Sequence, residues 1–64
     1  MARKITMWTV IYMAKDENDV ALLRQVLEDN DIIAMIRKSD EYFELLVPSQ
    51  EVSPAHNIII DTEI

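Results

Sequence analysis

The chain has 64 residues, half of them hydrophobic, with no cysteine, no glycine and a formal charge of −6 from twelve acidic and six basic residues. This length supports one domain near the lower limit of independent folding. Without cysteine the chain can form neither disulfides nor thiolate–metal sites. Oligomerisation is then the common remaining way to add to the stability of so small a core. The acidic balance excludes the basic stripe that binding to nucleic acid or to an anionic membrane surface requires.

The N-terminal segment is expected to be disordered over residues 1–4. Met1 to Ile5 has no continuous apolar run, so no signal peptide is expected. No later segment approaches the roughly 20 apolar residues of a membrane helix, and we therefore expect a cytoplasmic location.

Ile5 to Met13 is rich in β-branched and aromatic residues, which predicts a strand. We expect its side chains to divide between two faces, with Trp8, Val10 and Tyr12 toward the helices and Thr9, Ile11 and Met13 away from them. A shift of one residue in register would exchange the two sets and leave the outer face apolar in either case.

Asp16 to Asn30 has the pattern of an amphipathic helix. Asp16 is a preferred N-cap residue, and the acidic residues after it suit the positive end of the helix dipole. In a chain without glycine, either Asn30 or Asp31 must adopt the left-handed conformation that commonly ends a helix. Apolar residues at helical spacing predict the buried stripe: Val20, Leu23 and Leu27.

Two short apolar runs, Ile32 to Arg37 and Tyr42 to Val47, flank the polar segment Lys38 to Glu41 and predict a β-hairpin with a four-residue turn. Strict alternation predicts which residues share a face in each strand. In the first run one face has Ile32, Ala34 and Ile36 and the other has Ile33, Met35 and Arg37. In the second run one face has Phe43, Leu45 and Val47 and the other has Tyr42, Glu44 and Leu46.

The C-terminal segment is predicted to be a helix. Pro48 ends the preceding strand because it cannot donate to a ladder, and apolar residues then recur at helical spacing. Ser53 as N-cap with Pro54 at the first helical position is the simplest interpretation, and a turn from Ser49 can precede it. The β-branched run Ile58 to Ile60 is equally compatible with a strand.

The order strand, helix, strand, strand, helix predicts a single α+β domain over residues 1–64. We expect a ferredoxin-like plait that lacks its fourth strand, with sheet order 1-3-2 and both helices on one face. The alternative places the third strand outside the second. In the 1-3-2 order the first strand is an open edge, and the uncovered face is apolar. The residues expected on that face are Thr9, Ile11, Met13, Ile33, Met35, Tyr42 and Leu46.

The segments Trp8 to Ala14, Val20 to Leu27 and Leu46 to Pro48, together with Ile32, resemble a bacterial family of small, uncharacterised signal-transducing proteins. The resemblance covers residues 8–60 and implies a plait related to the nitrogen-regulatory PII proteins. The chain departs from the family pattern at Asp31, where glycine is usual, and at Pro54. It also lacks the long partner-binding loop of PII and any glycine or basic cluster suited to a nucleotide, so the resemblance implies the fold and not nucleotide sensing.

No residues predict a catalytic, cofactor or metal site. The single histidine, His56, could act only with a serine such as Ser53, which is better used as a cap. The acidic groups of the first helix lie at its opposite ends and lack the spacing of an EF-hand. Tyr42 and Phe43 resemble the base-stacking aromatics of RNA-binding plaits, but only Tyr42 would face outward and Glu44 beside it would repel phosphate. Glu44 is instead expected to join Asp40 and Glu41 in a solvated rim.

The sequence therefore predicts a non-enzymatic regulatory or protein-interaction module. We expect a homodimer or higher homo-oligomer that forms through the sheet face or edge, with another protein as a second class of partner. The alternative is a sensor of a metabolite or nucleotide whose ligand site lies between subunits.

Overall fold

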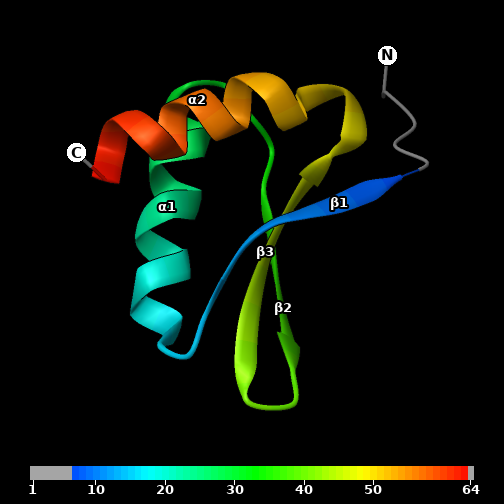
Figure 1. The fold of residues 1–64 in the computed structure, drawn as a ribbon. Helices are drawn as coiled ribbons and strands as arrows, with labels where there is room; N and C mark the ends of the chain where they lie inside the picture. Colours follow the sequence, from blue (N-terminus) through cyan, green and yellow to red (C-terminus); the bar gives the residue numbers. More distant parts are fainter. Residues whose placement is uncertain (1–6, 64) are drawn as a thin grey trace.

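A computed structural model describes residues 7–63, so the disorder expected for residues 1–4 lies outside the described part of the chain. Three strands form one antiparallel sheet in the order β1-β3-β2, with α1 beside it (Figure 1). The fold is α+β with βαββα topology, which confirms the predicted three-stranded plait. The elements are β1 (Trp8–Ala14), α1 (Glu17–Asp29), β2 (Met35–Ser39), β3 (Tyr42–Pro48), a 3₁₀ turn (Ser49–Glu51) and α2 (Val52–Glu63).

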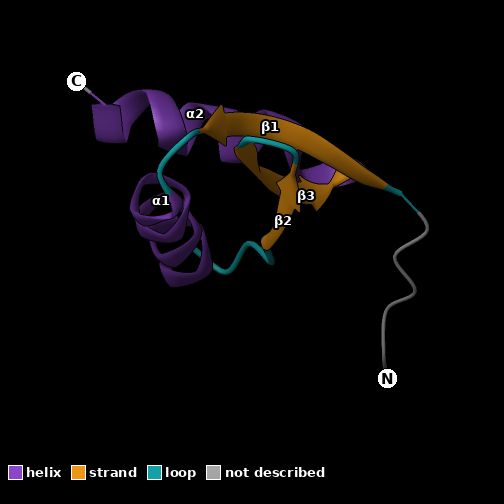
Figure 2. Ribbon diagram, turned by 90° about the horizontal axis from the view of Figure 1, so that it is seen from below, coloured by secondary structure: helices purple, strands orange, loops and turns teal. Residues whose placement is uncertain are grey.

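The core lies between the sheet and the two helices. The predicted stripe of α1 is buried there, and Leu45 and Val47 of β3 meet Ala55 and Ile59 of α2 in the same cluster. Both helices therefore cover one face of the sheet, as expected. Figure 2 views α1 nearly along its axis and shows α2 running across it.

Both ends of α1 are fixed by aspartate residues. The Asp16 carboxylate accepts a hydrogen bond from the backbone N–H of Asn18 at 3.0 Å, which confirms the predicted N-cap. At the other end Asp31 takes the left-handed conformation with φ 64°. The N–H groups of Asp31 and Ile32 then reach the carbonyls of Glu28 and Leu27 at 3.0 and 2.9 Å. This is a Schellman ending, with aspartate at the position glycine usually holds.

The hairpin is confirmed, but its turn is shorter than predicted. Ser39 pairs directly with Tyr42, so only Asp40 and Glu41 form the loop. Asp40 has φ 49°, a left-handed conformation that aspartate tolerates better than most residues. The strand β2 also begins later than predicted, at Met35, after a connecting segment in which Ile32 and Ala34 are buried.

The C-terminal segment is helical through Ile58 to Ile60, so the strand alternative is wrong. The expected start at Ser53 is also wrong, because the turn from Ser49 leads directly into a helix that begins at Val52. Pro54 is the third residue of that helix. The first four N–H groups of a helix have no intrahelical partner, so proline costs no helical hydrogen bond there.

Candidate interaction surface

One face of the sheet is not covered by either helix. Phe43, Leu45 and Val47 of β3 face the core, so the alternate residues of β3 and their register partners on β1 and β2 point the other way. In Figure 1 this face lies on the side of the sheet opposite α1. We call it the open face; it comprises Trp8, Val10, Met13, Met35, Arg37, Ser39, Tyr42, Glu44, Leu46 and Pro48.

A β-bulge in β1 decides which of its residues reach the open face. Val10 pairs with Leu46 and Tyr12 with Leu45, which leaves Ile11 as an extra residue in β1. Ile11 and Tyr12 therefore both lie on the helix side and contact the core.

The bulge makes the predicted faces of β1 partly wrong. Trp8 and Val10 lie on the open face, and Thr9 and Ile11 lie on the helix side, opposite to the prediction. Beyond the bulge the alternation shifts by one residue. Tyr12 and Met13 consequently lie where they were expected.

Thr9 has a structural role on the helix side. Its Oγ1 and the Oγ of Ser49 are hydrogen-bonded to each other at 2.7 Å. The N–H of Ser49 also donates to the carbonyl of Met7 at 3.2 Å. These bonds join the start of β1 to the turn before α2, and they exclude Thr9 from a contact on the open face.

Leu46 forms the centre of an apolar group on the open face. It lies on the central strand between its register partners Val10 and Met35, and only 2% of it is exposed. Val10 and Met35 are 36% and 37% exposed, and Met13 is half exposed. Of the residues predicted for the face, Met13, Met35, Tyr42 and Leu46 lie on it.

Ile33, the remaining predicted residue, is exposed in the segment between α1 and β2 and belongs to no strand. Trp8 and Val10 were absent from the predicted set. The apolar character of both faces of β1 was the only sequence signal for them.

A salt bridge crosses the open face next to the apolar group. The Nε of Arg37 donates to Oε1 of Glu44 at 2.8 Å, and its Nη2 lies 2.7 Å from the same oxygen. Only 12% of the Glu44 side chain is exposed, against 57% for Arg37. The expectation that Glu44 belongs to a solvated rim is therefore wrong, because the neighbouring side chains and its cross-strand partner enclose it.

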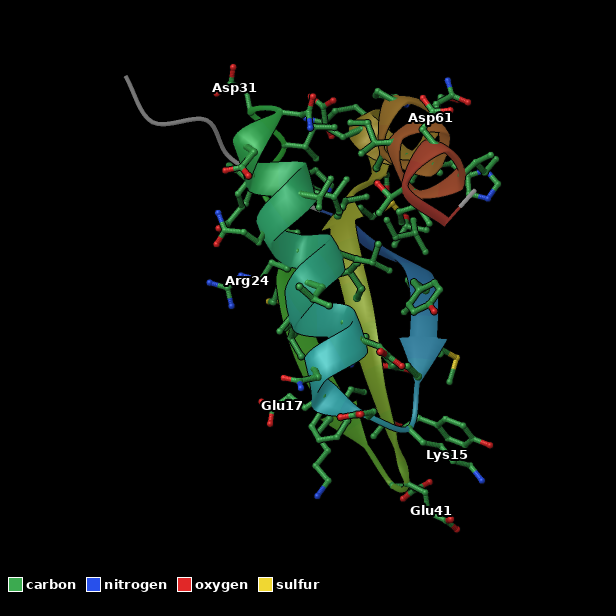
Figure 3. All side chains as sticks on the ribbon, turned by 90° about the vertical axis from the view of Figure 1, so that its left-hand side faces the viewer. Lys15, Glu17, Arg24, Asp31, Glu41 and Asp61 are labelled. Atoms are coloured by element: carbon green, nitrogen blue, oxygen red, sulfur yellow. The ribbon has the colours of Figure 1, made fainter. Side chains whose placement is uncertain are left out.

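The charges of the molecule are unevenly distributed. Figure 3 shows Glu17 and Asp31 at opposite ends of α1 and Asp61 on α2, all on the helix side. The open face has Arg37 and Glu44, and the ammonium of Lys15 lies 5.9 Å from the ring centroid of Tyr42 at its margin. The open face is thus close to neutral in a chain of net charge −6.

The outer edge of β1 is the second exposed feature of the sheet. Within residues 7–63, β1 pairs only with β3, so its other side has no strand beside it. Trp8–Ala14 contains no charged residue and no proline. An edge with these properties leaves backbone N–H and C=O groups unpaired by any described strand, although the bulge at Ile11 interrupts its regularity.

The helix side has a shallow depression among its described residues. This depression of about 280 Å³ lies between the helices and is lined by Val26, Asn30, Ile58, Asp61 and Thr62. Among the described residues, no three acidic, histidine or cysteine side chains are grouped as a metal site. His56 and Ser53 are both exposed on α2.

No protein-family model matches the chain, and comparisons with curated proteins and with solved structures return no significant match. The resemblance to the signal-transducing family therefore stays a prediction. Neither helix in the described residues has the length and apolar character needed to cross a bilayer.

Proposed function

We propose that this protein is a non-enzymatic interaction module that self-associates through its open face. The observation that supports the proposal is the apolar group around Leu46, which is flanked by partly exposed Val10 and Met35 on a face that no described element covers. Exposed apolar side chains gathered on one face, here Val10, Met13 and Met35, are characteristic of interaction sites.

A second copy of the chain fits this face better than a strongly charged partner. The open face is nearly neutral and contains one residue of each charge in Arg37 and Glu44, so two copies related by a two-fold axis present complementary groups. Any approach through the acidic helix side would instead bring together surfaces of the same charge.

The size of the sheet indicates a weak dimer. Strands of seven residues rising about 3.3 Å each and spaced about 4.8 Å apart give a flat footprint of roughly 23 by 14 Å. That is below the roughly 800 Å² per partner of a standard stable interface. We expect a dissociation constant on the order of 10 µM, equivalent to about −7 kcal/mol.

Met35→Glu tests the proposal. A carboxylate at this position would have to be desolvated in the interface, so we expect the variant to be monomeric at about 100 µM while the wild type is mainly dimeric. Sedimentation equilibrium at several concentrations measures the mass, and circular dichroism checks that the helices remain folded.

Leu22→Glu is the matched control, because Leu22 is also an exposed apolar residue, 67% accessible, but lies on α1 away from the open face. It should leave the mass of the dimer unchanged. A wild-type chain that stays monomeric at 100 µM would contradict the proposal. A Met35→Glu variant that still dimerises would place the contact elsewhere, with the β1 edge as the next surface to test.

A further inference from the structure

The salt bridge on the open face uses only part of the bonding capacity of its two side chains. Arg37 directs both Nε and Nη2 to Oε1 of Glu44, whereas a fork-to-fork pair would engage both carboxylate oxygens. A guanidinium has five N–H groups and 57% of the Arg37 side chain is exposed, so the N–H groups that are not directed at Oε1 remain accessible to a second acceptor.

These unused groups lie beside the surface proposed to be buried. Arg37 and Glu44 occupy the register position next to the Met35–Leu46 pair on the same face. A dimer that covers the apolar group also removes water from the salt bridge, and buried charges need partners for their remaining donors and acceptors. A second guanidinium and a second carboxylate would supply those partners.

We propose that the dimer axis passes close to this pair, so that Arg37 of each copy binds Glu44 of the other. At a two-fold interface each contact occurs twice with the roles exchanged. Two crossed contacts of this kind would form a four-residue charge network that selects another copy of this chain and fixes its register. The inference rests on the proposed self-association through the open face and adds the residues that determine its specificity.

Charge-exchange variants distinguish crossed contacts from a salt bridge that acts only within one chain. Arg37→Glu and Glu44→Arg each place like charges at the axis of their own homodimer, so each alone should dimerise at least about tenfold more weakly. Mixed together, the two variants are complementary at both crossed contacts, and we expect the heterodimer to regain wild-type affinity. Native mass spectrometry separates the species because the variants differ in mass.

The double variant R37E/E44R retains a salt bridge within each chain and is therefore expected to fold and to form its own dimer. Mixed with the wild type, it would place Arg37 opposite an arginine and Glu44 opposite a glutamate. Because the exchange leaves composition and mass unchanged, one of the two proteins is labelled uniformly with ¹⁵N, and we expect native mass spectrometry to show separate homodimers. A salt bridge confined to one chain would instead allow them to mix at random.

The helix α1 provides a control with the same change of net charge. Arg24 and Glu28 form an exposed pair at 3.3 Å on the helix side. Arg24→Glu and Glu28→Arg should leave the dimerisation affinity within about twofold of wild type, alone or mixed. Random mixing of the wild type with R37E/E44R would overturn the inference while leaving the proposed function intact, whereas a monomeric wild type would overturn both.

Discussion

Asp31 adopts an unfavourable left-handed backbone conformation that the end of α1 requires. Its φ of 64° lets the N–H groups of Asp31 and Ile32 reach back to the last carbonyls of α1. The left-handed region costs a typical L-residue about 1–2 kcal/mol, less for aspartate and least for glycine. Sequence reasoning narrowed this conformation to Asn30 or Asp31, and the structure assigns it to Asp31.

We predict that Asp31→Val destabilises the protein by about 1–2 kcal/mol, whereas Asp31→Gly leaves it equally stable or slightly more so. Both substitutions remove the same charge, so their difference isolates the backbone effect. Urea unfolding followed by circular dichroism measures the free energy of unfolding for each variant. Equal stabilities for the two variants would show that the conformation of residue 31 is not under strain.

Glu44 illustrates what the sequence could not show at this scale. Its position in an alternating strand correctly predicts that it points away from the core. Its burial depends on side chains of two other strands and on Arg37, which becomes its neighbour only through the register of the hairpin. A polar residue in an alternating strand predicts which way its side chain points. It does not show how much of that side chain is covered by its neighbours.

Among the elements, α1 was predictable because one strong periodic signal agreed with the capping signals at both ends. The strand β1 was less so. Both of its faces are apolar, so no polar residue fixes its register, and a bulge leaves no mark in such a sequence. The predicted start of α2 was also wrong. The 3₁₀ turn after Pro48 continues directly into the helix, so Ser53 lies inside the helix and does not cap it.

The N-cap of α1 allows a test at the level of the element. A helix of 13 residues is marginal by itself, so its first hydrogen bonds contribute measurably to the whole fold. We predict that Asp16→Ala lowers the free energy of unfolding by about 1 kcal/mol, while Asp16→Asn, which keeps the accepting oxygen, costs less than half of that. Chemical denaturation of the two variants side by side decides the matter, since similar losses would mean that the cap bond contributes little.

At the scale of the whole molecule, the two sides of the protein have different character. Most carboxylates lie on the helices and at the hairpin tip, as Figure 3 shows for Glu17, Asp31, Glu41 and Asp61. The opposite side is the nearly neutral open face. Composition predicted an acidic protein, and the strand patterns predicted an apolar sheet face. Only the folded arrangement shows that the acidic groups are separated from that face.

The topology also predicts unequal stability within the sheet. The strand β3 pairs on both sides, whereas β1 pairs on one side and is interrupted by the bulge. We predict that amide hydrogens of β3 exchange at least about tenfold more slowly than those of β1 in the monomeric Met35→Glu variant. Exchange followed by NMR resolves the two strands. Equal protection would indicate that the sheet opens only as one unit.

The order of strands has a further consequence while the protein is being made. The only described partner of β1 is β3, which follows it after α1 and β2. At synthesis rates of about 5–20 residues per second, β1 emerges from the ribosome roughly 2–7 seconds before β3 can pair with it. During that interval the uncharged segment Trp8–Ala14 lacks its strand partner, and the acidic residues of the first helix that follows it favour its solubility.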